Sequence, residues 1–320
     1  MRRTLLLLAL LVGCRQQPPE VTVTPASADA PVDVDAWWSD GFAELNGYDF
    51  EQWHYDEVHE GHAVLVFVRE EFSRTATVKA SPRRPASDRY GVMKLNIVKN
   101  FQTGVYDYDL MTSLFAAWDP RDGRRAGAPV KLTMSTQDWC GIELEELTFG
   151  RSKITRTRNS YYDGESIAAD HLDLPKDGVL VDELFMMVRG IPNPVLRPGE
   201  ERRLSVLPSV EHARLQQSRL QWTTGTLRRG RERARTKVPA GTFATDTYRL
   251  SVSDDVEYVF QVESAFPHRI IEWRGPRGEH ARLMGSKRMK YWQLNRRRDE
   301  PLRSTLGLAP VRQHNIGVNP

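Results

Sequence analysis

Two cysteines, Cys14 and Cys140, are the only thiols in this 320-residue chain. Cys140 could act as a nucleophile, and eight histidines offer a general base. A catalytic thiol needs an electropositive, partly exposed position that lowers its pKa. If residues 132–148 form one strand, however, alternation places Cys140 on the same face as Leu132 and Met134. We therefore expect Cys140 to be a small buried hydrophobic side chain.

The densest group of metal-ligand types contains three histidines and two glutamates: His54, Glu57, His59, Glu60 and His62. Zinc needs three or four ligands that converge within about 2.0–2.3 Å of one point. These histidines lack a recognised metal-binding spacing, and they straddle a turn that the sequence predicts at residues 59–61. We therefore expect a solvated hairpin tip, with no metal site and no cofactor.

Arginine is concentrated in residues 228–235, which contain Arg228, Arg229, Arg231, Arg233 and Arg235. Guanidinium groups bind phosphate bidentately, so these residues are candidate contacts to lipid phosphates, acidic lipopolysaccharide or an envelope partner. The alternative is an exposed loop or the polar face of a strand, because charge runs are usually solvated.

Aromatic and acidic residues alternate in residues 106–109 (YDYD) and follow one another in residues 161–165 (YYDGE). This composition can bind sugars or cations, and it also suits sheet edges and turns. Tyr106 and Tyr108 are therefore candidate ligand or partner contacts. The sequence contains no Gly-rich phosphate loop, Gly-x-Ser-x-Gly elbow or dinucleotide fingerprint. We expect a non-enzymatic protein.

Strand-like alternation dominates the chain from residue 37 onwards. Residues 92–99 place Met93, Leu95 and Ile97 on one face, and residues 64–68 (VLVFV) predict a central strand covered on both faces. The C-terminal third predicts an antiparallel meander, and apolar residues at helical spacing predict one helix over residues 181–188. We expect a mainly-β fold: a long curved antiparallel sheet or half-barrel with one or two covering helices.

The N-terminus predicts export. Arg2 and Arg3 precede an apolar stretch over residues 5–12, which is too short to cross a hydrocarbon core of about 30 Å as a helix. We expect a signal peptide over residues 1–13 and a flexible tether over 14–36. An antiparallel body over 37–295, as one sheet or two sub-sheets, and an irregular tail over 296–320 then follow.

The net charge and the cysteine content limit the classes of binding partner and the covalent bonds that we expect. The formal net charge is +3, and removal of Arg2 and Arg3 with the signal lowers it to +1, so nucleic acid is not an expected partner. If Cys14 is modified, Cys140 has no internal partner for a disulfide, and the body must depend on its hydrophobic core.

Residues 11–14 (LVGC) resemble the lipobox of bacterial lipoproteins. The resemblance implies cleavage between Gly13 and Cys14 and a lipid on Cys14 that attaches the chain to a membrane. Arg15 follows Cys14 where an aspartate would resemble an inner-membrane retention signal, so we expect an outer-membrane lipoprotein whose body lies in the periplasm.

Several longer stretches resemble a family of uncharacterised bacterial lipoproteins: residues 63–68 (AVLVFV), 95–106 (LNIVKNFQTGVY), 110–115 (LMTSLF) and 137–141 (QDWCG). Some members carry the label septum formation inhibitor, which belongs to a smaller α/β cytoplasmic family and is not implied for a strand-rich exported chain. Residues 238–283 are similar to periplasmic β-sheet domains of the lipoprotein-carrier type. Such carriers hold acyl chains inside a curved sheet, which favours an apolar or lipid-like ligand.

The leading hypothesis is thus a lipid-anchored, non-enzymatic protein that binds an apolar or lipid-like ligand or an envelope partner. Two alternatives remain open: an envelope thiol hydrolase that uses Cys140 with a histidine, and a purely structural envelope assembly protein.

Overall fold

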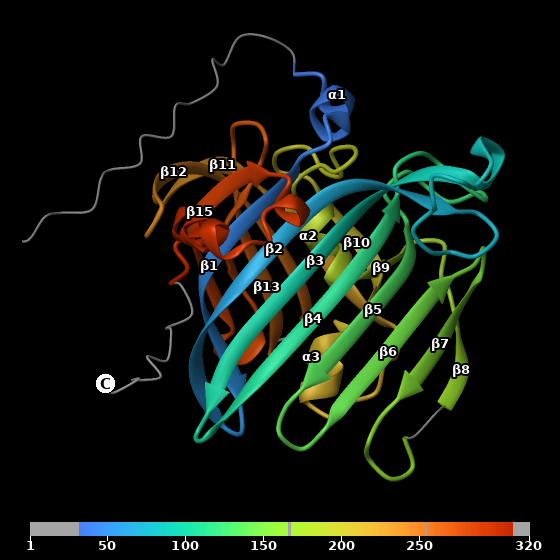
Figure 1. Ribbon diagram of the computed structural model, residues 1–320, viewed down its shortest axis with the longest axis horizontal. Coiled ribbons are helices and arrows are strands. Elements are labelled where there is room, and N and C mark those ends of the chain that lie inside the picture. Colours follow the sequence, from blue (N-terminus) through green and yellow to red (C-terminus); the bar gives the residue numbers. More distant parts are fainter. Residues whose placement is uncertain (1–31, 166–167, 254, 310–320) are drawn as a thin grey trace, which may run out of the picture. The chain divides into compact units, whose positions relative to one another are not determined.

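The computed structural model describes residues 32–165, 168–253 and 255–309, and its strands join in one sheet. The strand order is β8-β7-β6-β5-β4-β3-β2-β1-β15-β14-β13-β12-β11-β10-β9 (Figure 1). Neighbouring strands are antiparallel, except that β9 and β10 are parallel. The bounds are β1 (Ala43–His54), β2 (Glu57–Ser73), β3 (Arg89–Thr103), β4 (Tyr106–Ala117), β5 (Pro129–Gln137), β6 (Ile142–Phe149), β7 (Lys153–Asn159), β8 (Ala168–Asp173), β9 (Gly178–Leu180), β10 (Glu201–Leu207), β11 (Thr223–Val238), β12 (Gly241–Ser253), β13 (Val256–Glu263), β14 (Ile270–Arg274) and β15 (His280–Met289).

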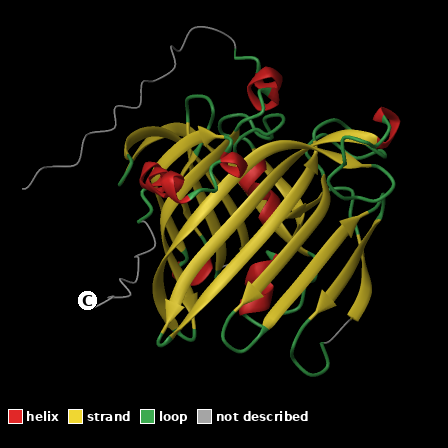
Figure 2. Cartoon of the chain, in the orientation of Figure 1, coloured by secondary structure: helices red, strands yellow, loops and turns green. Residues whose placement is uncertain are grey.

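The sheet curves around short helices, as Figure 2 shows. The α-helices are α1 (Val34–Ser39), α2 (Leu184–Met187) and α3 (Val210–Leu215), and the 3-10 helices are η1 (Ala86–Asp88), η2 (Val181–Glu183), η3 (Pro276–Gly278), η4 (Tyr291–Gln293) and η5 (Arg297–Leu306). α2 and α3 lie on the concave side of the sheet (Figure 1). The predicted mainly-β fold, a curved antiparallel sheet with covering helices, is confirmed, and the helix predicted over 181–188 corresponds to η2 and α2.

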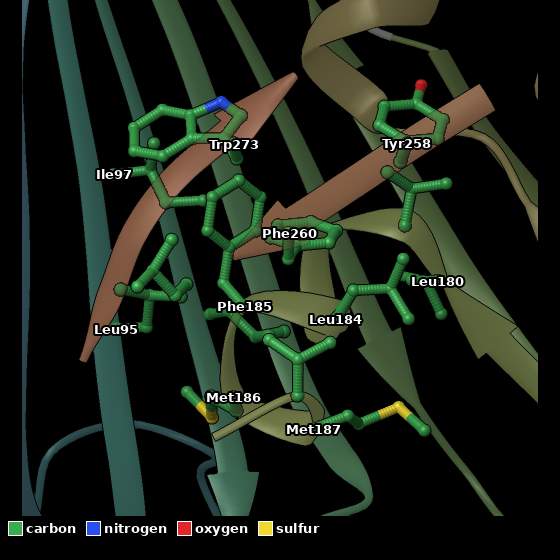
Figure 3. Close-up of a cluster of buried hydrophobic side chains, with 14 of the residues drawn as sticks. Leu95, Ile97, Leu180, Leu184, Phe185, Met186, Met187, Tyr258, Phe260 and Trp273 are labelled. Atoms are coloured by element: carbon green, nitrogen blue, oxygen red, sulfur yellow. The ribbon is translucent and has the colours of Figure 1, made fainter. Parts of the chain in front are cut away.

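Side chains fill the concave side. Phe185 of α2 makes edge contacts with the rings of Phe260 and Trp273, at centroid distances of 5.2 and 5.3 Å. Leu95 and Ile97 of β3 face the same cluster (Figure 3). Burial of each such side chain contributes about 1.5–3 kcal/mol, so packing against α2 stabilises the sheet curvature.

The convex side carries a second core under η5. Val66 and Val68 of β2 pack there with Leu306 and Leu308, while Leu65 and Phe67 face the concave side. β2 is therefore covered on both faces, as predicted. Part of the segment expected to be irregular thus forms a 3-10 helix with a buried leucine, Leu306.

The turn between β1 and β2 lies at Tyr55 and Asp56, and the turn predicted at residues 59–61 is wrong. Both turn residues have positive φ, 50° and 61°, as a two-residue hairpin turn of type I′ requires. Gly61 lies inside β2 instead. A Cβ there would stand 2.1 Å from the carbonyl oxygen of Asn100, so this glycine permits close approach of β3.

Because neighbouring strands run antiparallel, successive connections lie at opposite ends of the sheet. We call the end with turns at residues 55–56, 104–105, 138–141 and 275–279 the short-turn end. The opposite end, with connections at residues 74–88, 118–128 and 150–152, is the long-loop end. Among the described residues no helix has the length and apolar character needed to span a membrane.

Candidate functional site

A cavity of about 240 Å³ opens at the short-turn end. Four aromatic side chains line it: Trp53, Tyr55, Tyr108 and Tyr162. The polar part of the lining includes Thr136, Asp138, Glu143, Arg214, Gln216 and Gln217. The two aromatic-acidic segments of the sequence, 106–109 and 161–165, therefore meet here, because Tyr108 and Tyr162 belong to one each.

The aromatic side chains are held by one another. The Tyr55 and Tyr108 hydroxyls lie 2.8 Å apart, and the Tyr106 hydroxyl donates to that of Tyr55 at 3.2 Å. Tyr108 also stacks on Phe101 of β3 and lies 3.2 Å from Nε2 of His54. Burial raises the pKa of the Tyr108 phenol and lowers the pKa of His54, so both groups are neutral at pH 7.

Several charged groups of the cavity bind partners within the protein. Arg214, at the end of α3, forms ion pairs with Glu143 and Glu165. Burial raises the pKa of Glu143, although Arg214 opposes the shift. Asp138 Oδ1 accepts hydrogen bonds from the backbone N–H groups of Cys140 and Gly141 at 2.6 and 3.0 Å. Three carboxylates (Asp56, Asp138 and Glu143) and two guanidinium groups (Arg214 and Arg277) line the cavity, so its charges nearly balance.

One buried hydroxyl of the cavity lining has no hydrogen-bond partner among the described residues. Thr136 is only 5% exposed, and its hydroxyl makes no hydrogen bond to any described residue. A buried hydroxyl that lacks a partner carries a desolvation cost, which a ligand hydroxyl could offset.

Exposed apolar side chains also lie at the short-turn end. Val105 and Trp139, at the tips of the β3–β4 and β5–β6 hairpins, are 79% and 73% exposed, and Ile142 and Tyr161 are also exposed. Exposed large apolar residues gathered at one end of a protein mark interaction surfaces. These residues can therefore contact parts of a ligand or partner that lie outside the cavity.

A buried ionic cluster lies behind the cavity, and Leu215 lines both the cavity and the small void of about 20 Å³ beside the cluster. Lys99 Nζ lies 2.6 Å from Glu211 Oε1 and 3.2 Å from Glu279 Oε1. Trp273 Nε1 donates to the same Glu279 oxygen at 2.8 Å. Burial alone would lower the pKa of Lys99, but the two carboxylates raise it above its ordinary value, so Lys99 is charged.

The expectation that Cys140 is buried is wrong. Cys140 is exposed in the turn between β5 and β6, because residues 132–148 form two strands and not one. The turn is stabilised by the two hydrogen bonds to Asp138. Exposure meets one requirement of a catalytic thiol, but its sulfur makes no hydrogen bond to a histidine in the described part of the chain.

The arginine run lies on β11, and seven strands separate it in the sheet order from β4, which carries Tyr106 and Tyr108. Arg228 pairs with Glu201, and Arg229 pairs with Asp246. Arg231, Arg233 and Arg235 are exposed. The structure therefore does not bring the arginine and tyrosine candidates into one site. Gly13 and Cys14, the cleavage and lipidation residues, lie outside the described residues.

Sequence reasoning missed the buried cluster and most polar groups of the cavity. Lys99 continues the inward parity of Leu95 and Ile97, so its position on the inner face could have been recognised. Arg214, Glu211 and Glu279 come from segments that are remote in sequence, and no local pattern connects them.

Comparisons of the chain with protein-family models, with curated proteins and with solved structures find no match.

Proposed function

We propose that this chain is a non-enzymatic binding protein of the bacterial envelope, anchored by a lipid on Cys14, that holds a neutral carbohydrate group at the short-turn end. The main support for this proposal is the cavity of about 240 Å³, in which four aromatic rings lie beside polar side chains. Sugars present C–H faces that pack on aromatic rings and hydroxyls that bond to carboxylate, amide and guanidinium groups.

The packed concave side favours this ligand class over an acyl chain. An acyl chain held inside the sheet would need an apolar cavity of roughly a few hundred Å³ on the concave side. The void beside the buried cluster is only about 20 Å³, and α2 fills the space between β3 and β14. Of the two hypotheses drawn from the sequence, an envelope partner bound at the surface is therefore better supported than an apolar or lipid-like ligand held inside the sheet.

The test is a titration of the purified chain with a neutral trisaccharide, maltotriose or tri-N-acetylchitotriose, followed by tryptophan fluorescence. We expect saturable binding that Tyr162→Ala weakens about threefold to tenfold, because an aromatic contact contributes roughly 0.5–1.5 kcal/mol. Tyr291→Ala is the matched control, since Tyr291 belongs to η4 and does not line the cavity. Equal losses in the two variants, or no saturable binding of either sugar, would contradict the proposal.

A further inference from the structure

A second cavity, of about 210 Å³, lies at the long-loop end, at the opposite end of β4 and β5 from the first. Four arginines line it: Arg121, Arg124, Arg125 and Arg151. The first three come from the β4–β5 connection, and Arg151 comes from the β6–β7 turn. Two connections that are separate in sequence therefore supply one set of guanidinium groups.

The carboxylates near this cavity neutralise only half of its positive charge. Arg121 Nε donates to Asp122 at 2.8 Å, and Arg125 Nη2 donates to the buried Glu183 at 3.0 Å. Arg124 and Arg151 form no ion pair with any described carboxylate. The lining has four positive charges and one negative charge, from Asp122, and Glu183 adds a second negative charge outside the lining. The cavity at the short-turn end, with three carboxylates and two arginines, has no such positive excess.

Two of the guanidinium groups are fixed in place and partly desolvated. Arg124 donates to the carbonyl oxygen of Pro129 and lies 5.5 Å from the ring centroid of Phe149. Arg121 lies 3.9 Å from the ring centroid of Tyr90, and its Nη1 is buried without a hydrogen-bond partner among the described residues. Burial also lowers the pKa of Arg124, and an anion would oppose that shift.

We propose that this second cavity binds a phosphate group, carried either by a soluble phosphorylated compound or by a lipid headgroup. The planar fork of a guanidinium group matches the oxygens of a phosphate and can form two hydrogen bonds to it. Arg121 and Arg124 are positioned by aromatic rings, and Arg151 is exposed, with no donor bound to a described residue. The site is independent of the carbohydrate cavity, and its test does not depend on that proposal.

Isothermal titration calorimetry of the purified chain with inorganic phosphate at millimolar concentrations tests the site. We expect saturable heat that the double variant Arg121→Gln/Arg151→Gln reduces about tenfold or more in affinity, because each substitution removes charge-assisted donors. Arg231→Gln/Arg233→Gln is the matched control, since these arginines are exposed on β11 and outside the cavity. Arg151 makes no hydrogen bond or ion pair to any described residue. The single variant Arg151→Gln should therefore fold like the wild type and lose less phosphate affinity than the double variant.

Sedimentation with vesicles of phosphatidylcholine, with or without phosphatidic acid, identifies the source of the phosphate. If the double variant loses the additional binding caused by phosphatidic acid, the ligand is a lipid headgroup. If phosphatidic acid has no effect on the wild type, the ligand is a soluble phosphorylated compound. Absence of saturable heat with inorganic phosphate, or equal affinity of the wild type and the double variant, overturns the proposal.

Discussion

Lys99 is a charged residue in the interior of the protein; its partner Glu211 is buried with it, and its partner Glu279 is largely buried. Removal of one member of such a cluster leaves uncompensated charge, which typically costs about 3–5 kcal/mol. We therefore predict that Lys99→Met lowers the free energy of unfolding by about that amount, measured by urea denaturation at pH 7. Lys79→Met, at an exposed ion pair with Glu70, should change it by less than about 1 kcal/mol.

If Lys99→Met were as stable as Lys79→Met, the ionic cluster would have no structural role. The triple variant Lys99→Met/Glu211→Gln/Glu279→Gln removes all three charges together. We expect it to recover part of the lost stability, because the uncompensated carboxylates are then absent.

Asp182, in η2, should make stability depend on pH. Burial raises the pKa of this carboxyl to about 7, although the Ser209 hydroxyl and the Val210 N–H both donate to it. Between the unfolded pKa near 3.8 and about 7 the folded state binds more protons than the unfolded state. The stabilising contribution of Asp182 is therefore complete below about pH 4 and is lost as the pH rises to about 7, by on the order of 4 kcal/mol.

Urea denaturation of the wild type and of Asp182→Asn from pH 4 to pH 8 measures this contribution. Other titrating groups, such as Glu211 and His212, are present in both proteins, so the difference between the two curves isolates Asp182. We expect the wild type to lose stability relative to the variant as the pH rises. Parallel curves would show that Asp182 has an ordinary pKa.

At the scale of elements, two glycines determine where the C-terminal helix docks. Gly47 of β1 and Gly285 of β15 face each other in the ladder. A Cβ on Gly47 would stand 2.1 Å from the carbonyl oxygen of Leu306, and one on Gly285 would stand 2.4 Å from that of Thr305. The backbone of η5 therefore lies directly on the sheet, which only residues without a side chain permit.

Gly47→Ala should displace η5 and free the backbone around the arginines near its start, Arg296 to Arg298, whose side chains are already exposed. We expect trypsin to cleave there at least severalfold faster than in the wild type, measured by mass spectrometry of timed digests. Gly91→Ala is the control, because a Cβ at Gly91 in β3 would make only ordinary contacts, the shortest at 3.5 Å. Equal cleavage rates in the two variants would contradict the docking argument.

The sequence predicted elements whose information is local. Alternation identified the inward residues of β3 and both faces of β2, and helical spacing located α2. It failed at Gly61 and Cys140, because the period of two cannot distinguish one long strand from a hairpin, nor a turn glycine from one that allows close approach of a neighbouring strand. The cavity required tertiary information, since its lining comes from β1, β4, β5, β6 and α3.

At the scale of the whole described body, one sheet contains all fifteen strands. A single core cluster joins both halves of the sheet, since it includes Leu95 of β3, Trp273 of β14 and Phe185 of α2. We therefore predict one cooperative unfolding transition, with coincident circular dichroism and tryptophan fluorescence curves in urea. Two separated transitions would instead indicate independent sub-sheets, the alternative that the sequence left open.

The pairing of β1 with β15 has a consequence for the order of folding. Ala43 lies opposite Met289, so one edge of β1, the first strand in the chain, pairs with β15, the last strand. That pairing can form only after β15 has been synthesised. Until β15 has been made, β1 presents an open edge of hydrogen-bonding groups, a state in which chains associate with one another. Contacts of such long sequence separation also slow folding. During synthesis, the strands of the N-terminal half can therefore pair with one another as hairpins. The pairing of β1 with β15, which joins the two halves of the sheet, forms only when nearly the whole chain is present.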